Sequence, residues 1–217
     1  MTDQSGRPAD ARLRSARTKR DRTRAALLHA AQTSFGLHGW AGTRMESVAA
    51  TAGVSPATAY NHFATKHVLI AHVVRPYVDT LVAHARQDVS EGRPVAHALA
   101  DQVGALVSTM SRHRRLSGAF LAACQDYAAR VHAPPRADDP LDPRVIAPLS
   151  EAIRLLVDQG QRTGQLPPYP PAEDISAMIA TLLLLRGIEA PDEPPAETTR
   201  LMLTVLFGAL SPTRLPA

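Results

Sequence analysis

Apolar residues recur at helical spacing along most of the chain. Leu27, Leu28, Ala31 and Phe35 fall on one face of a helix with 3.6 residues per turn, and later segments repeat the pattern. No segment alternates apolar and polar residues as a half-buried strand does. Aromatic residues make up only 4% of the chain, which also favours close-packed helices over a β-sandwich. The pattern predicts an all-α protein with about nine helices.

The first expected helix runs from about residue 18 to Gly39, a natural left-handed cap. The next begins at Thr43-Arg44-Met45-Glu46, which matches a capping box. In that motif the Thr43 hydroxyl accepts from the Glu46 amide, and the Glu46 carboxylate accepts from the Thr43 amide. We therefore expect a short helix over residues 43–52.

A second pair of caps follows Gly53. Ser55 precedes Pro56, which supplies an N-cap and a proline at the first helical position, so a helix is expected over residues 56–63. Thr65 should cap a fourth helix. Pro76 lies inside that helix and should kink it or end it early.

Proline-rich breaks separate the remaining predicted helices. Each carries apolar residues on one side, and we expect them at residues 94–114, 116–132, 146–157, 175–188 and 201–210. The organisation predicted is a flexible basic arm (residues 1–17), a small helical domain (18–72) and a larger helical domain (73–217).

Residues 45–63 have the organisation of a helix-turn-helix. Two short capped helices flank a glycine turn, so the first would brace the second in a major groove. The side chains expected to pack inward are Val48, Ala49, Val54 and Phe63. Those expected to face DNA are Pro56, Ala57, Tyr60 and Asn61. Asn61 can pair with adenine, and the small Ala57 permits close approach to a thymine methyl.

At these residues the sequence resembles the DNA-binding domain of the TetR family of transcriptional regulators. The resemblance covers about residues 21–72 and rests on Ala30-Ala31, Phe35, Gly39, residues 43–49, Ala52-Gly53-Val54-Ser55, residues 59–63 and Lys66. His67 stands where the family commonly has an acid. The resemblance implies a homodimer, paired through the last two helices, with an N-terminal helix-turn-helix and a larger domain that binds a small ligand.

The resemblance also implies roles for individual residues. Tyr60 and His62 would clamp phosphate, Lys66 would anchor phosphate at the start of the fourth helix, and Arg44 would meet phosphate with some reach to a base. The full set of expected DNA-binding residues is Thr43, Arg44, Ser55, Pro56, Ala57, Thr58, Tyr60, Asn61, His62 and Lys66. Their partner would be a double-stranded, pseudo-palindromic operator.

Charge is concentrated at the N-terminus. Residues 1–70 carry ten Lys and Arg against four acids, a net of +6, whereas the other 147 residues have a net of −2. A basic head on a faintly acidic body is typical of a protein whose head meets a polyanion. We expect residues 17–24 to follow a minor groove or the flanking backbone, and residues 7–14 to be a solvated charge run.

The larger domain should hold the effector. The apolar positions expected to line its pocket are Val103, Val107, Met110, Phe120, Cys124, Tyr127, Ile153 and Val157, although for each position taken alone ordinary core is the favoured interpretation. Tyr127 with the soft side chains Met110 and Cys124 indicates a mostly apolar ligand with one hydrogen-bonding anchor. Residues 176–185 are apolar nearly all round, so they belong in a core or in the dimer interface, where a charge at Leu183 should disrupt pairing.

Enzymatic motifs are missing from the sequence. The nine histidines form no His-x3-His pair backed by a carboxylate, and no Walker loop, dinucleotide glycine pattern or Gly-x-Ser-x-Gly occurs. The one cysteine excludes a disulfide framework and a Cys-rich zinc site. We expect no enzyme activity, no cofactor and no metal.

No run approaches ~18 apolar residues, so we expect a cytoplasmic protein without a membrane partner. The function predicted is a ligand-responsive dimeric transcriptional regulator, a repressor released from its operator by a small molecule. Two alternatives stay open. One is a regulator controlled by a protein partner, and the other is a helical small-molecule carrier or enzyme whose basic head is incidental.

Overall fold

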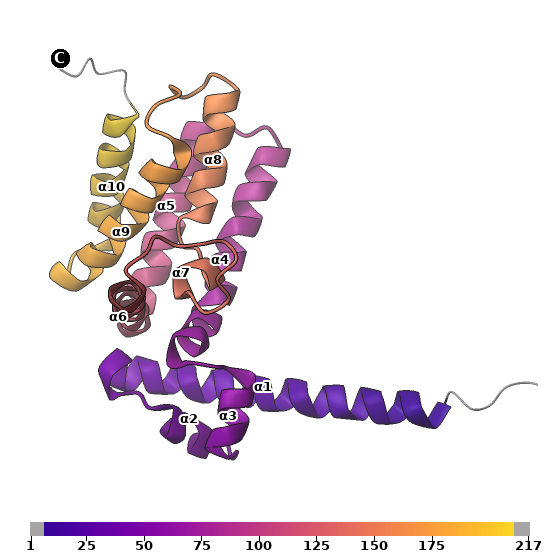
Figure 1. The fold of residues 1–217 in the computed structure, drawn as a ribbon. Coiled ribbons are helices and arrows are strands. Elements are labelled where there is room, and N and C mark those ends of the chain that lie inside the picture. Colours follow the sequence, from indigo (N-terminus) through magenta and orange to yellow (C-terminus); the bar gives the residue numbers. More distant parts are fainter. Residues whose placement is uncertain (1–6, 211–217) are drawn as a thin grey trace, which may run out of the picture.

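A computed structural model describes residues 7–210, with the side chains of residues 7–13 and 16 left out of the description. This part of the chain is all-α and contains ten helices (Figure 1). The helices are α1 (Arg7–Gly42), α2 (Met45–Thr51), α3 (Pro56–His62), α4 (Lys66–Ser90), α5 (Val95–Arg112), α6 (Arg114–Val131), α7 (Pro143–Ile146), α8 (Glu151–Arg162), α9 (Ala172–Glu189) and α10 (Pro195–Ala209). The prediction of an all-α fold with an N-terminal helix-turn-helix is confirmed.

The helices form a head and a body joined by α4. In the head, α2 and α3 lie against one side of α1, while α6 of the body crosses the other side (Figure 1). The core of the head is built from Leu27, Phe35, Val48, Ala59 and Phe63, which are all buried. Val48, Ala49 and Phe63 are buried as predicted, and Val54 packs partly buried against the same core.

Helix α1 is longer than the sequence pattern indicated. It begins at Arg7, so residues 7–17 form its first turns instead of a flexible arm. This segment is rich in Ala and Arg, which are good helix formers, and its one proline lies at the second position, where a helix tolerates it. The extension projects past α2 and α3 (Figure 1). At the other end Gly39 has φ 65° and kinks the helix.

Two prolines bear on where the helices end. Helix α4 continues through Pro76 to Ser90, so it does not end early. The Thr80 hydroxyl donates to the Pro76 carbonyl oxygen at 3.0 Å, within the turn that follows the proline. Conversely, the helix expected over residues 146–157 is divided, because Pro148 follows Ile146 and the chain restarts as α8 at Glu151.

The last two helices pack against each other and against α5 on one side of the body (Figure 1). Leu183 of α9 is only 2% exposed, because it points into the body. The expectation that Leu183 contacts a second subunit is therefore wrong. The apolar residues that α9 and α10 leave exposed are Met178, Leu182, Leu185, Ile188, Leu201 and Val205.

Candidate nucleic-acid interface

The helix-turn-helix is built by α2, a tight turn and α3. Gly53 has φ 69° in this turn, a conformation that costs a glycine nothing. The turn is closed by the Val54 amide, which donates to the Ala49 carbonyl oxygen at 3.0 Å. Helix α3 buries Ala59 against the head and leaves Pro56, Ala57 and Asn61 exposed. Small and polar side chains are thus presented to solvent along one helix, as a major-groove reader requires.

The two predicted N-caps of this unit have different outcomes. Ser55 caps α3, since its Oγ accepts from the Thr58 amide at 3.2 Å. The capping box at Thr43 is wrong. Arg44 occupies the N-cap position of α2, and the Thr43 hydroxyl donates to the Gly39 carbonyl oxygen at 2.8 Å. Thr43 is 1% exposed, so its side chain serves the kink of α1 and is withdrawn from the surface.

Glu46, which does not form the predicted capping box, contacts Tyr60. The Tyr60 hydroxyl donates to Oε1 of Glu46 at 3.3 Å, which ties the outer surface of α3 to the first turn of α2. Desolvation and the Glu46 carboxylate together raise the pKa of Tyr60. Tyr60 therefore stays protonated at neutral pH and keeps a donor at the protein surface.

His62 lies at the end of α3, near two arginines of α1. Partial burial, followed by the charges of Arg20 and Arg24, lowers the pKa of His62. The imidazole is therefore neutral at pH 7 and adds no charge. The Arg24 guanidinium lies over the Phe63 ring, 4.5 Å from its centroid, so α1 brings its positive charge to the C-terminal end of α3.

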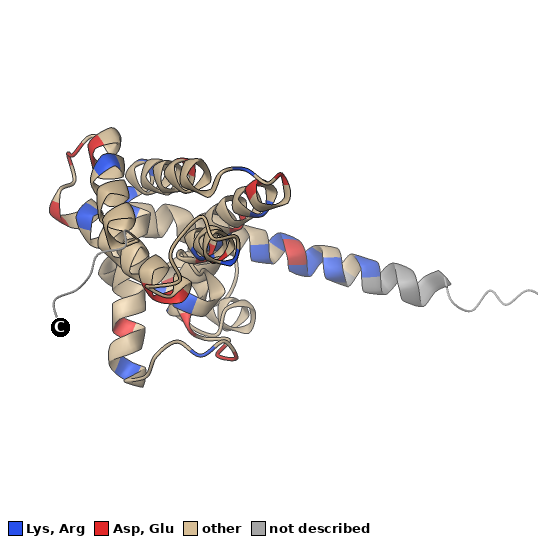
Figure 2. Cartoon of the chain, turned by 90° about the horizontal axis from the view of Figure 1, so that it is seen from above, with Lys and Arg blue, Asp and Glu red and all other residues tan. Residues whose placement is uncertain are grey.

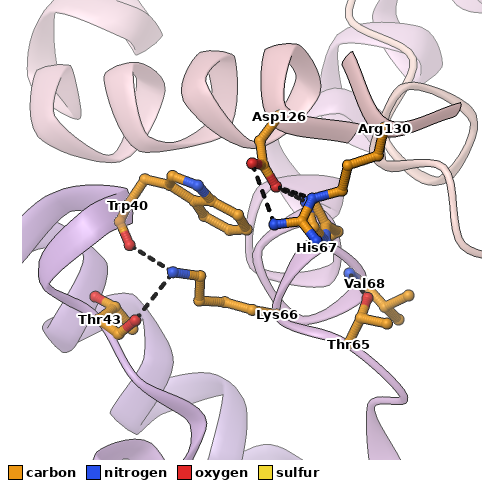
Figure 3. Close-up of polar contacts among 8 residues, drawn as sticks. All are labelled: Trp40, Thr43, Thr65, Lys66, His67, Val68, Asp126 and Arg130. Atoms are coloured by element: carbon orange, nitrogen blue, oxygen red, sulfur yellow. Dashed lines mark hydrogen bonds and ion pairs between the residues drawn. The ribbon is translucent and has the colours of Figure 1, made fainter. Parts of the chain in front are cut away.

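Lys66 points into the protein instead of toward solvent. Its Nζ donates to the carbonyl oxygens of Trp40 at 2.8 Å and Thr43 at 3.1 Å, and lies 4.0 Å from the centroid of the Trp40 ring (Figure 3). Desolvation lowers the pKa of Lys66. The ammonium thus caps the carbonyl groups left at the end of α1 and braces the head. The phosphate contact expected of Lys66 stays a prediction.

The next residue joins the head to the body. His67 Nε2 lies 2.7 Å from Oδ2 of Asp126 in α6, and Arg130 Nε donates to the same oxygen at 2.9 Å (Figure 3). The His67 ring also lies 4.8 Å from the Trp40 ring, centroid to centroid. The Arg130 and His67 hydrogen bonds lower the pKa of Asp126, so the carboxylate is ionised. Arg115 of α6 adds a second link by donating to the Leu37 carbonyl oxygen at 3.0 Å.

The predicted DNA-binding residues thus fall into three groups. The exposed group lies on one surface of the head and consists of Arg44, Ser55, Pro56, Ala57, Tyr60 and Asn61. Thr58 and His62 are half-buried beside them. Thr43 and Lys66 are turned inward, as described above. Sequence reasoning did not identify Trp40, Asp126 or Arg115 as links between head and body, because no local pattern pairs residues so distant in sequence.

The predicted pocket residues are divided between a small cavity and solid core. Met110 and Phe120 line a cavity between α4, α5 and α6, together with Tyr77, Leu116 and Leu149. Its volume is about 30 Å³, room for little more than a water molecule. Val107 and Met110 border a neighbouring hollow against α9. Val103, Ile153 and Val157 are fully buried core and line neither space.

Cys124 and Tyr127 also lie outside these spaces. Burial raises the pKa of the Cys124 thiol to about 12, so it stays protonated and unreactive at neutral pH. The Tyr127 hydroxyl donates to Oδ2 of Asp139 at 2.6 Å. This hydrogen bond anchors the loop after α6. It occupies the Tyr127 hydroxyl, the group that was expected to bind a ligand.

Within residues 7–210, side chains of His, Cys, Asp and Glu do not gather in groups of three that could hold a metal ion. In the same part of the chain, no helix combines the length and the apolar character needed to cross a bilayer.

The segment that contains the helix-turn-helix resembles a known protein family. Residues 27–73 match the family described as "Bacterial regulatory proteins, tetR family". The transcriptional activator FasR of Mycolicibacterium smegmatis is 40% identical over 81 residues, which is 37% of this chain and 37% of FasR. The chain thus matches little more than a third of the length of that relative.

Solved structures resemble a larger part of the chain. FadR of Thermus thermophilus, a TetR-family transcriptional repressor solved with lauroyl-CoA, has a TM-score of 0.68 and 20% identity over 89% of this chain and 98% of FadR. RolR, solved with resorcinol, has a TM-score of 0.63 and 18% identity over 89% of each chain. At these identities the likeness establishes the fold, with both head and body included.

The inward position of Lys66 yields a stability prediction. Lys66→Met keeps the length of the side chain but removes the donor to two carbonyl groups. We expect the free energy of unfolding to fall by about 1–3 kcal/mol, the range for losing a hydrogen bond from a charged group to partly buried partners. Urea denaturation followed by circular dichroism measures this. Lys19→Met, at an exposed position of α1, is the control and should leave the midpoint unchanged; equal midpoints for both variants would contradict the brace.

Proposed function

Since the chain belongs to the TetR family of bacterial regulatory proteins, we propose that it is a ligand-responsive, dimeric, DNA-binding regulator of transcription. The observation that carries the proposal is the α2–turn–α3 unit, which buries Ala59 and exposes a row of small and polar side chains on the surface of the head. A regulator of this kind works in the cytoplasm, where bacterial DNA lies.

We assign base reading to the exposed side of α3. Ala57 has no side chain beyond Cβ, so the helix can approach a thymine methyl closely, and Asn61 can form two hydrogen bonds with an adenine. Arg44 stands exposed in front of α2 and is assigned to phosphate. Tyr60 keeps its hydroxyl proton and is assigned to a phosphate oxygen, as an alternative acceptor to Glu46.

We assign effector binding to the body, where the cavity of Tyr77, Met110 and Phe120 is mostly apolar. A ligand larger than a water molecule must displace the surrounding helices to enter it. The lauroyl-CoA of FadR and the resorcinol of RolR support a small molecule with a substantial apolar part. Phe120 lies on α6, the helix that also holds Asp126 and Arg115 against the head. A ligand that prefers a shifted α6 would therefore change the position of the head.

The direction of regulation stays a prediction. We expect the effector to release DNA, as in a repressor. FadR is described as a repressor and FasR as an activator, so the relatives include both directions.

We propose that two copies pair through the outer faces of α9 and α10. Met178, Leu182 and Leu185 are spaced i, i+4 and i+7, so they form one exposed apolar stripe on α9. Leu201 and Val205 extend the apolar surface onto α10, which packs beside α9. A patch of this kind on two adjacent helices is characteristic of a subunit interface.

The whole proposal is tested by selecting bound duplexes from a random pool with the purified protein at moderate salt. We expect enrichment of a pseudo-palindrome, because two identical α3 helices would read two identical half-sites. If no sequence is enriched, and the bound duplexes share only a salt-dependent affinity, the proposal of a specific dimeric regulator is contradicted.

On the selected duplex, Arg44→Gln and Asn61→Ala should differ in kind. Arg44→Gln removes one phosphate contact per subunit, so affinity for every sequence should fall and the salt slope should drop by about 2 per dimer. Asn61→Ala should cost about 1–3 kcal/mol at one base pair of each half-site and relax the preference there. Binding titrations at several salt concentrations, on the selected duplex and on single-base variants, separate the two. Uniform weakening by Asn61→Ala would move that residue to the backbone.

The interface is tested with two apolar positions of equal exposure. Met178 on α9 and Leu37 at the end of α1 are each 60% exposed. Met178→Glu places two like charges at the proposed interface and should shift the protein from dimer to monomer in sedimentation velocity. Leu37→Glu is the matched control and should leave the dimer intact. A dimer unaffected by Met178→Glu would refute this interface.

A further inference from the structure

The basic extension of α1 is a surface feature that the helix-turn-helix does not account for. Arg14, Arg17, Lys19, Arg20 and Arg22 are all exposed, with Asp21 as the one acid among them. Figure 2 shows the blue positions spaced along the extension as it leaves the body. An isolated helix of this length is marginal in water. The positive charge along this helix is suited to a partner with a regular row of negative charges.

The helix-turn-helix itself has little positive charge. Residues 45–65 contain no Lys and no Arg, while Glu46 adds a negative charge and the lowered pKa of His62 keeps that ring neutral. Lys66, the next cation, donates inward to Trp40 and Thr43. Affinity of a protein for duplex DNA comes largely from neutralised phosphates. Arg44 and, from α6, Arg130 border the groove beside Tyr60. The other cations near α3 are those of α1, which reach His62 and Phe63.

The basic residues of α1 are aligned with α3. Arg17, Arg20 and Arg24 are spaced i, i+3 and i+7, so they lie on one face of the helix. Leu27 and Ala31 continue that face into the buried core of the head. The same face meets α3, since Arg24 covers the Phe63 ring and Arg20 acts on the His62 pKa. The face changes from apolar to basic where the helix leaves the head, which makes the basic part continuous with the DNA-reading surface.

The extension points away from the proposed dimer interface. Helices α9 and α10 lie on one side of the body, and the extension of α1 projects toward the opposite side (Figure 1). If two copies pair through α9 and α10, as proposed above, the two extensions point away from each other. They are then directed outward, past the half-sites that the two α3 helices read.

We propose that this extension is a second DNA-binding element, which grips the phosphate backbone of the duplex outside each half-site through Arg17 and Arg20. Residues 14–22 span ~13 Å at ~1.5 Å per residue, which corresponds to about four base pairs of duplex on each side. The inference rests on the proposed function. It adds that the flanks, whatever their sequence, contribute to affinity.

The test compares two double variants of the same segment. Arg17→Gln with Arg20→Gln removes two charges from the face toward α3, and Lys19→Gln with Arg22→Gln removes two charges from the opposite face. Glutamine has nearly the helix propensity of arginine and lysine, so both variants should fold and melt like the wild type. Each is titrated with two duplexes. One ends at the selected half-sites, and the other extends about ten base pairs of arbitrary sequence beyond each.

On the extended duplex the Arg17/Arg20 variant should bind at least about tenfold more weakly, with a salt slope lower by about 3–4 per dimer. The affinity of the Lys19/Arg22 variant for this duplex should fall less than about threefold, because these two charges would act on the DNA only through longer-range electrostatic attraction. On the trimmed duplex both variants should match the wild type. Equal losses from the two variants, a loss of the same size on both duplexes, or no loss at all would each overturn the proposal.

Failure of the proposed function can be recognised separately. A long duplex of arbitrary sequence should still distinguish the two variants, because phosphate contacts do not depend on sequence. If selection enriches no palindrome while this difference persists, the extension binds DNA but the regulator assignment is wrong. If a palindrome is enriched while the two variants behave alike, the regulator assignment stands and the extension proposal is wrong.

Discussion

The position of the head depends on how the chain satisfies the carbonyl groups where α1 ends. A helix terminus leaves backbone acceptors without partners, and the kink at Gly39 exposes those of Trp40 and Thr43 near the start of α4. The Lys66 ammonium binds both, and the adjacent His67 binds Asp126 of the body. Two consecutive residues thus connect three elements of the structure. Lys66 fixes the start of α4 against the end of α1 within the head, and His67 fixes α4 against α6 of the body.

The fold could be predicted from local patterns where those patterns act alone. Ser55 caps α3 because its hydroxyl oxygen accepts from the nearby amide of Thr58, and its other polar contact, the Thr58 hydroxyl, belongs to the same turn. Thr43 satisfies the same sequence rule, yet the Gly39 carbonyl captures its hydroxyl. The capping motif is local, whereas the kink that decides its outcome depends on how α1 packs. Leu183 shows the same limit, because a helix that is apolar nearly all round does not indicate which side faces a partner.

The sequence predicted which positions form the candidate site, but it predicted the arrangement of their side chains only in part. The exposed side of α3 follows from helical spacing, since Ala59 and Phe63 bury one side and leave Ala57 and Asn61 on the other. The role of Lys66 could not be predicted in this way, because its partners lie 26 and 23 residues away in the chain. Pairing across that distance depends on the tertiary fold. The pocket residues were the least predictable, since apolar core and apolar cavity wall have the same sequence pattern.

The separation of base reading from charge has a physical consequence for control by a ligand. Because α3 is nearly uncharged, the DNA contacts proposed for it would be short-ranged and would require the correct spacing of two heads, whereas the basic extension of α1 would retain attraction for any duplex. A change in spacing would then abolish recognition of the operator before it abolishes attraction to DNA. Such a protein would leave its operator while staying near the duplex, and re-binding after loss of the effector would be a search over a short distance. The lack of Lys and Arg in residues 45–65 favours this behaviour, because specific contacts that carry little charge can be lost with little change in the salt-dependent part of the affinity.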